Sequence, residues 1–169
     1  MHQRKERPPI DASELRALAL AYVARYLTSQ AKLDHYLRRK LRERGWADEG
    51  DPPIAAMVQH CAALGFVDDS GFATAKTASL ARRGFGSNRI RAALKGAGVS
   101  DTIIAQANCP SEDVARQIAL AFVRRKRIGG YATKPATPDQ RRKWIATLMN
   151  AGHGYALARE LAWQDPFED

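Results

Sequence analysis

The side chains best suited to catalysis or metal binding are few and scattered in this chain of 169 residues. Its four histidines stand far apart, and none lies at metal-ligand spacing from another histidine or a cysteine. The adjacent His60 and Cys61 point to different sides of a helix. The chain carries no GxxxxGKS, GxxxxGKT or GxGxxG phosphate-binding loop. We therefore expect no catalytic residue, no cofactor and no metal ion, and we predict that the protein is not an enzyme.

Two adjacent carboxylates, Asp68 and Asp69, form the pair that could do acid-base chemistry or bind a metal ion. They stand directly before an apolar pattern of helical spacing. At that place an aspartate accepts hydrogen bonds from backbone N–H groups, and its charge complements the helix dipole. The pair therefore predicts a helix cap rather than a catalytic site. The two glycines at 84–86 predict a turn between helices.

Positive charge is the property of the composition that most restricts function. The chain has 27 Lys and Arg against 18 Asp and Glu, a formal net charge of +9 and a pI near 9.9. A polyanion is the expected partner of such a protein. Roughly half of the clustered basic residues serve only to solvate helix faces. The surplus predicts a basic track, repeated along the chain, that neutralises phosphates. The clusters are Arg38–Arg44, Arg82–Lys95, Arg124–Arg127 and Arg141–Lys143.

The remaining composition favours a folded cytoplasmic protein. Hydrophobic residues make up 45% of the chain, which is enough for a core. Cys61 and Cys109 lack a CxxC partner, which favours a reducing compartment over a disulfide scaffold. We find no apolar run of transmembrane length and no secretory signal. The abundant alanines favour closely packed helices.

Apolar residues recur at helical spacing from end to end, whereas alternating strand patterns are absent. We predict an all-α protein. Most expected helices begin at a capping residue or a proline, and several end at a glycine. Nine helices are expected, beginning near Asp11, Ser29, Pro53, Asp68, Ser87, Ser100, Ser111, Thr137 and Tyr155.

The spacing of apolar residues and glycines in every third helix reveals an internal repeat. The repeat has an interval of about 54 residues, which is typical of a tandem array. The matching triplets are Leu37/Leu41/Gly45, Ile90/Leu94/Gly98 and Trp144/Leu148/Gly152. We predict three tandem three-helix repeats at 11–67, 68–109 and 110–163, with flexible tails at 1–10 and 164–169 and a mobile loop at 128–136.

Three-helix units with a turn before the last helix are also typical of DNA readers of the helix-turn-helix class. Such a protein needs Arg, Asn or Gln on the last helix to contact base edges. The last helices here offer little beyond Gln59, Gln106 and Arg159, so specific base recognition is not expected. We predict that Phe66, Phe72 and Phe85 serve in packing rather than in base stacking.

Several segments resemble the RecX family of regulatory proteins. LGFVDDSGFA at 64–73, RGFGSNRIR at 83–91 and LKGAGV at 94–99 are similar to its central signature. The segments 22–27 and 37–45 resemble its first repeat. The segment 148–155 resembles its third repeat, in which His153 and Gly154 depart from the usual pattern. The resemblance extends over about residues 15–162.

This resemblance implies an elongated, curved array of helical repeats without enzymatic activity. RecX proteins bind RecA, chiefly as its filament on single-stranded DNA. They restrain strand exchange, ATP hydrolysis and co-protease activity in DNA repair, homologous recombination and the SOS response. We expect the same partners here, with weak direct DNA binding, no membrane contact and a monomeric chain. Filament end-capping and groove binding both stay open.

Ten basic residues are the expected contacts with the RecA filament or its DNA. They are Arg38, Arg39, Arg42, Arg89, Arg91, Lys95, Arg124, Arg125, Arg141 and Lys143. The alternative function is that of an autonomous, non-specific DNA-binding protein, which the basic clusters alone would favour.

Overall fold

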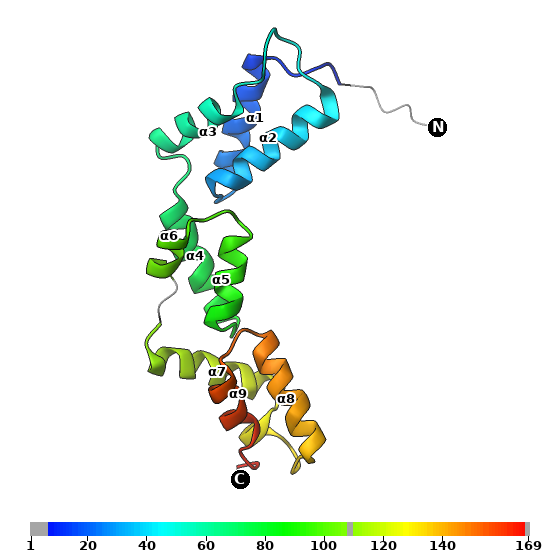
Figure 1. The fold of residues 1–169 in the computed structure, drawn as a ribbon, viewed down its shortest axis with the longest axis vertical. Helices are drawn as coiled ribbons and strands as arrows, with labels where there is room; N and C mark the ends of the chain where they lie inside the picture. The colour runs from blue at the N-terminus through cyan, green and yellow to red at the C-terminus, as the bar shows by residue number, and fades with distance from the viewer. Residues whose placement is uncertain (1–6, 108–109, 168–169) are drawn as a thin grey trace, which may run out of the picture. The chain divides into compact units, whose positions relative to one another are not determined.

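The computed structural model describes residues 7–107 and 110–167, and this part of the chain is helical (Figure 1). Its described residues form nine α-helices and one short 3-10 helix, η1, with no strand beyond a single isolated bridge. The prediction of an all-α protein is confirmed. The elements are α1 (Ala12–Arg25), α2 (Gln30–Arg44), α3 (Ile54–Ala63), α4 (Asp69–Arg82), α5 (Ser87–Lys95), α6 (Asp101–Ala107), α7 (Glu112–Lys126), η1 (Gly129–Tyr131), α8 (Pro138–Asn150) and α9 (Tyr155–Ala162).

Most of these helices begin where the sequence predicts a cap. The Asp11 carboxylate accepts a hydrogen bond from the Glu14 backbone N–H over 2.7 Å. The hydroxyls of Ser29, Ser100, Ser111 and Thr137 each accept one in the same way. Each of these bonds satisfies an N–H group that the helix itself cannot pair. One predicted cap is wrong by a residue, because Gly86 rather than Ser87 takes the cap position of α5.

The side chains of the adjacent Asp68 and Asp69 cap two different helices. Asp68 accepts a hydrogen bond from the Ser70 N–H at the start of α4, over 2.9 Å. Asp69 reaches instead to the start of α2, where it accepts the Gln30 N–H over 2.9 Å. The predicted capping of the following helix is confirmed for Asp68. Asp69 caps an earlier helix instead, and its hydrogen bond joins parts of the chain that lie far apart in sequence.

Contacts between residues divide the chain into two compact units. Unit 1 is drawn from Met1–Phe72 with Ala97–Val99, and unit 2 from Ala73–Gly96 with Ser100–Asp169. This division places the turn after α5 with the first helices. The three repeats that the sequence suggests stay a prediction.

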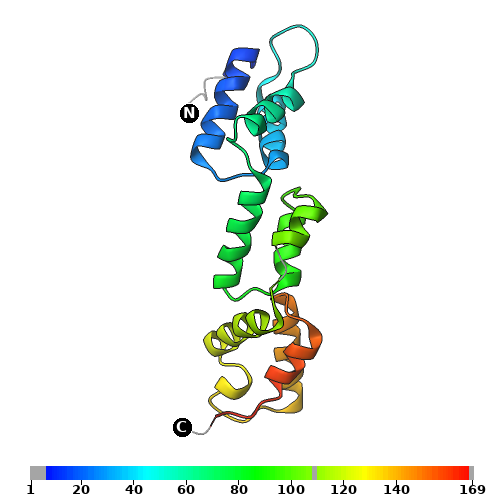
Figure 2. The same cartoon turned by 90° about the vertical axis from the view of Figure 1, so that its left-hand side faces the viewer.

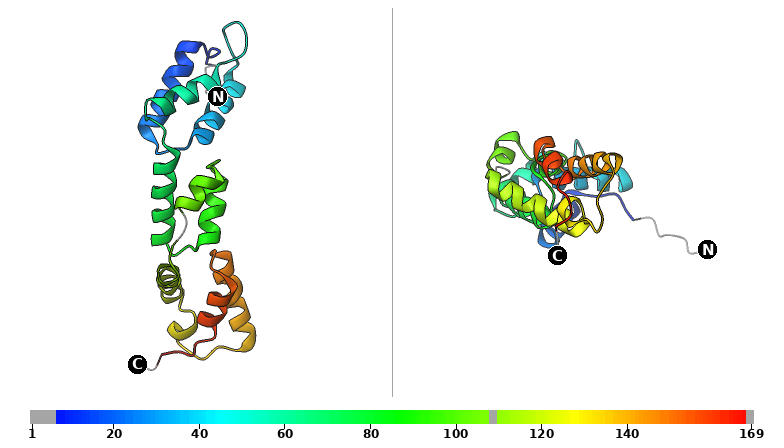
Figure 3. Two further views of the ribbon diagram at one scale, coloured as in Figure 1. Left: turned by 60° about the vertical axis from the view of Figure 1, so that its left-hand side comes forward. Right: turned by 90° about the horizontal axis from the view of Figure 1, so that it is seen from below.

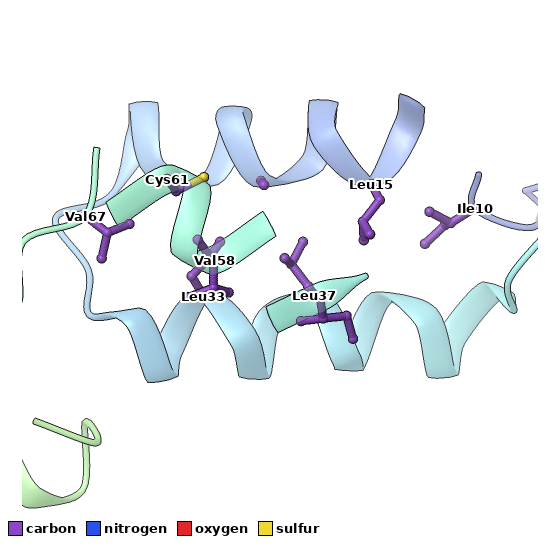
Figure 4. Close-up of a cluster of buried hydrophobic side chains, with 9 residues drawn as sticks. Ile10, Leu15, Leu33, Leu37, Val58, Cys61 and Val67 are labelled. Carbon is purple, nitrogen blue, oxygen red and sulfur yellow. The ribbon is translucent and has the colours of Figure 1, made fainter. Parts of the chain in front are cut away.

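Unit 1 has an apolar core between α1, α2 and α3 (Figure 4). Leu15, Leu33 and Leu37 are completely buried there, and Cys61 is 1% exposed. Ile10 lies in the same core although it was expected in the flexible tail. Its N–H donates to the Gly45 carbonyl and its carbonyl accepts the Ala47 N–H. The expectation of a flexible tail is therefore wrong for this residue.

The helices α7, α8 and α9 of unit 2 share a second core, and they lie together in Figure 2 and in the left panel of Figure 3. Small residues such as Ala119 and Ala158 are completely buried in it, as expected for closely packed helices. The segment expected as a mobile loop begins inside this core, because Ile128, Gly129 and Gly130 are buried. Near the end of the chain, the Phe167 N–H donates to the Gly130 carbonyl over 2.8 Å.

The turn after α5 packs against the start of α2, and the turn after α8 packs against the start of α5. We call these two contacts the joints. In unit 1 the Ser29 hydroxyl donates to the Ala97 carbonyl over 2.6 Å. In unit 2 the Gly86 N–H donates to the Ala151 carbonyl over 2.9 Å, and the Asn88 N–H donates to the Gly152 carbonyl over 3.1 Å.

Glycine is required at these joints because a side chain would collide with the neighbouring segment. A Cβ atom on Gly98 would lie 2.2 Å from the Ala31 Cβ, and one on Gly86 would lie 2.4 Å from the Gly152 oxygen. Gly152 also has a φ of +95°, a conformation that other residues adopt at a cost. Gly98 and Gly152 therefore mark packing contacts as well as helix ends, whereas a Cβ on Gly45 would have no atom within 4 Å.

The joint of unit 2 predicts unequal effects of alanine at two neighbouring glycines. Gly152→Ala combines strain at positive φ with a Cβ that would lie 2.4 Å from the Arg89 nitrogen. We expect it to lower the free energy of unfolding by about 2–4 kcal/mol. Gly154→Ala is the matched control, because no atom lies within 4 Å of its added Cβ. It should cost less than about 1 kcal/mol. Urea denaturation measures both, and equal losses would contradict the role of the joint.

His153 makes the same joint sensitive to pH. Its side chain is buried, and its Nε2 lies 3.0 Å from the Gly84 carbonyl oxygen, to which an Nε2–H donates. Burial lowers the pKa of His153 below its usual value, and the hydrogen bond to Gly84 opposes that shift. The unfolded chain therefore binds a proton at a higher pH than the folded chain does.

It follows that stability should fall as the pH drops below about 6.5, the ordinary pKa of histidine. Above that pH His153 is neutral in both states and contributes no pH dependence. His153→Gln keeps a hydrogen-bond donor but does not titrate, so its stability should fall less between pH 7.5 and 5.5. Thermal melts of both proteins across this range test the expectation, which identical pH profiles would contradict.

Candidate polyanion-binding site

The ten basic residues expected as contacts lie on four helices. Most of them are exposed, as binding requires. They differ in the groups that surround each charge. They are Arg38, Arg39 and Arg42 on α2; Arg89, Arg91 and Lys95 on α5; Arg124 and Arg125 on α7; and Arg141 and Lys143 on α8.

The basic cluster on α2 is largely paired with carboxylates of its own unit. Arg38 makes two hydrogen bonds to Asp34, over 2.7 and 3.0 Å. Glu43 accepts from Lys40 over 2.8 Å and lies 3.7 Å from Arg39. The hydrogen bond from Lys40 holds the pKa of Glu43 below its usual value. Much of the positive charge of α2 is therefore balanced before any partner arrives.

Arg141 serves the packing of unit 2. Its side chain is 14% exposed. The guanidinium donates to the carbonyls of Ala136 and Trp163, over 3.3 and 2.7 Å, and to the Asp165 carboxylate over 2.5 Å. It also lies over the Trp163 ring. These contacts join α8 to the segment after α9 and leave Arg141 little freedom to bind a partner.

A depression of roughly 570 Å³ in unit 2 gathers basic residues from three helices and one turn. Its lining combines the end of α4, the turn before α5, and parts of α5, α7 and α8. None of the lining residues is acidic. They are Arg82, Arg83, Phe85, Arg89, Phe122, Arg125, Lys126, Thr147, Asn150 and Ala151. We call this surface the arginine depression.

Aromatic rings and backbone carbonyls hold the guanidinium groups of the arginine depression. Arg83 and Arg89 lie 5.1 and 4.6 Å from the centre of the Phe85 ring, and Arg125 lies 5.7 Å from that of Phe122. Arg89 donates to the Asn150 carbonyl over 3.0 Å, and Arg125 donates to the Arg83 carbonyl over 2.5 Å. These neutral partners orient the cations without cancelling their charge.

The structure thus brings together two of the ten expected residues, Arg89 and Arg125. It adds Arg82, Arg83 and Lys126, which belong to basic clusters of the sequence but were not singled out. Only the fold could identify them, because their partners come from helices far apart along the chain. Lys95 lies 3.9 Å from Asp101, outside the depression. The binding roles of all ten residues stay predictions.

The aromatic residues bear out the expected packing roles in part. Phe72 is 4% exposed, and Phe85 packs against the core of unit 2. Phe66 is 51% exposed and lies outside the cores, so a packing role for it stays a prediction.

The described residues hold no group of three or more His, Cys, Asp or Glu side chains that could bind a metal ion. Cys61 is buried, which raises the pKa of its thiol above the usual value. Cys109 lies outside the described residues. In the same part of the chain, no helix has the length and apolar character needed to span a membrane.

Comparison with known proteins identifies the family of this fold. A model described as RecX, second three-helix domain, matches residues 68–107. The chain is 34% identical over 146 residues to a regulatory protein RecX from Chlorobaculum tepidum, covering 84% of each chain. The chain belongs to the RecX family.

Other comparisons agree with that assignment. A regulatory protein RecX from Myxococcus xanthus is 27% identical over 97% of this chain and 95% of its own. The crystal structure of RecX from Lactobacillus salivarius matches with a TM-score of 0.70 at 15% identity, covering 89% of this chain and 93% of that one. A second RecX crystal structure matches with a TM-score of 0.65 at 17% identity, covering 89% and 72%. The last two comparisons show the fold alone.

The contrast between Arg141 and Lys143 on α8 gives a test of their structural roles. Arg141→Gln removes hydrogen bonds to two carbonyls and a carboxylate, so we expect the free energy of unfolding to fall by about 1–2 kcal/mol. Lys143→Gln changes an exposed residue of the same helix and should stay within about 0.5 kcal/mol of the original protein. Urea denaturation compares the two, and equal stability of both variants would contradict the packing role of Arg141.

Proposed function

We propose that this protein binds RecA, chiefly as the filament on single-stranded DNA, and inhibits its recombinase, ATPase and co-protease activities. Membership of the RecX family is the observation that carries the proposal. The protein acts in the cytoplasm as a monomer, modulates DNA repair, recombination and the SOS response, and needs no cofactor or catalytic residue of its own.

The distribution of charge supports a filament as the partner. A filament on DNA presents protein and phosphate together, over a length that several parts of the chain can contact at once. Contacts of modest affinity then combine, because the first contact raises the effective concentration of the next. The net charge of +9 and the carboxylate-free arginine depression favour association with such a polyanion.

The ATPase activity of RecA on single-stranded DNA gives the direct test. We expect the protein to lower that activity when it is present at fewer than one copy per RecA subunit. Binding of the protein to naked DNA should be measured in the same buffers, at two salt concentrations. Inhibition under conditions in which free DNA is not bound would demonstrate recognition of the filament. No inhibition at excess protein would refute the proposal.

The alternative is an autonomous, non-specific DNA-binding protein, and the arginine depression is the observation that favours it. In that case inhibition should follow DNA binding closely at both salt concentrations, because the two proteins would compete for the strand. A dissociation constant for naked DNA no tighter than about 10⁻⁴ to 10⁻⁶ M at physiological salt would count against this alternative.

A further inference from the structure

We propose that the arginine depression of unit 2 binds neighbouring phosphates of single-stranded DNA, independently of base sequence, and that the basic cluster of α2 does not. The inference assigns the DNA contact to one surface of the chain. It rests on the proposed function only in the choice of a single strand as the ligand.

The first step of the argument is the balance of charge. Five cations line the depression, from Arg82, Arg83, Arg89, Arg125 and Lys126, and no carboxylate is among the lining residues. The basic cluster of α2 instead has Asp34 and Glu43 within ion-pair distance of its cations. A phosphate that enters the depression therefore gains attraction without first breaking an ion pair, whereas one that approaches α2 competes with a carboxylate already in place.

The second step is the order of the guanidinium groups before a ligand binds. Arg83 and Arg89 share the ring of Phe85, and Arg125 lies against Phe122. Hydrogen bonds to backbone carbonyls fix Arg89 and Arg125 further. Because these side chains are held in place, binding costs less of their conformational entropy. Guanidinium groups also match phosphate geometry, since they offer pairs of parallel N–H donors.

The third step distinguishes phosphates from bases as the groups recognised. Proteins that bind single strands through bases provide aromatic faces for stacking. In the depression, guanidinium groups already lie over Phe85 and Phe122, and Phe122 is only 5% exposed. The rings therefore position cations, and the cations contact the backbone. A contact made to phosphates alone carries no information on sequence.

Two triple variants of the full-length protein test the assignment with equal changes in net charge. Arg83→Gln/Arg89→Gln/Arg125→Gln alters the depression, and Arg38→Gln/Arg39→Gln/Arg42→Gln alters α2. Fluorescence anisotropy with labelled oligo-dT of 30 nucleotides, over a series of salt concentrations, measures their binding. We expect at least a tenfold loss of affinity at low salt for the first variant, and less than a threefold loss for the second.

The salt dependence gives a second readout. Each phosphate contact on a single strand contributes about 0.7 to the slope of log affinity against log salt. The depression variant should lose about 2 from the magnitude of that slope, and the α2 variant should lose almost none. Equal losses in the two variants, or a larger loss in the α2 variant, would overturn the assignment.

A conservative variant keeps the test decisive if the glutamine variant fails to fold. Arg83→Lys/Arg89→Lys/Arg125→Lys retains the charge and loses the paired donors, so affinity should fall about three- to tenfold. Circular dichroism establishes that each variant is folded. A folded lysine variant with unchanged affinity would overturn the role of the paired guanidinium donors, because charge alone would then explain binding.

Competition separates the remaining ligands. An oligonucleotide of mixed sequence should displace oligo-dT as well as unlabelled oligo-dT does, while ATP and pyrophosphate should displace it poorly. If ATP displaced labelled oligo-dT at a lower concentration than the oligonucleotide does, the proposal that single-stranded DNA is the ligand would be overturned. The depression variant could instead keep its affinity for free DNA and lose its affinity for the RecA filament. That result would overturn the assignment, because an acidic protein surface, rather than phosphate, would then be the ligand of the depression. Loss of DNA binding in that variant would support the assignment even if the original protein failed to inhibit RecA.

Discussion

The close approach of a turn to the start of an earlier helix is the constraint on which both units depend. At the joint of unit 2, two backbone N–H groups from Gly86 and Asn88 meet carbonyls of Ala151 and Gly152. Side chains cannot fit between segments at this separation, so glycine is fixed at Gly86 and Gly152. The glycine interval of about 54 residues in the sequence therefore reflects more than the positions at which helices end. It records where one backbone must reach another.

A similar contact between backbones holds Ile10 against the end of α2. Ile10 donates its N–H to the Gly45 carbonyl, as Asn88 does to the carbonyl of Gly152 at the matching place. Its side chain also completes the core of unit 1. Ile10 was expected in a flexible tail, but these contacts make it part of the fold of unit 1.

Local sequence was sufficient to predict the helices and most of their caps, because those features depend on residues only a few positions apart. Contacts between distant segments were not readable in the same way. The pairing of Asp69 with Gln30 and the burial of Gly129 and Gly130 arise from other helices. The candidate site shows the same limit. Basic clusters were visible in the sequence, but the neighbours that neutralise or orient each arginine were not.

Neighbours, more than the number of basic residues, decide what positive charge can do in this protein. A carboxylate orients an arginine, as Asp34 orients Arg38, but its negative charge also weakens the attraction for an anion. An aromatic ring or a carbonyl holds it and leaves the charge intact, as Phe85 and the Asn150 carbonyl do for Arg89. The fold places the first arrangement on α2 and the second in the arginine depression. The basic cluster of α2 and the arginine depression therefore differ in the free energy that each can gain by binding phosphate, although both come from similar basic clusters in the sequence.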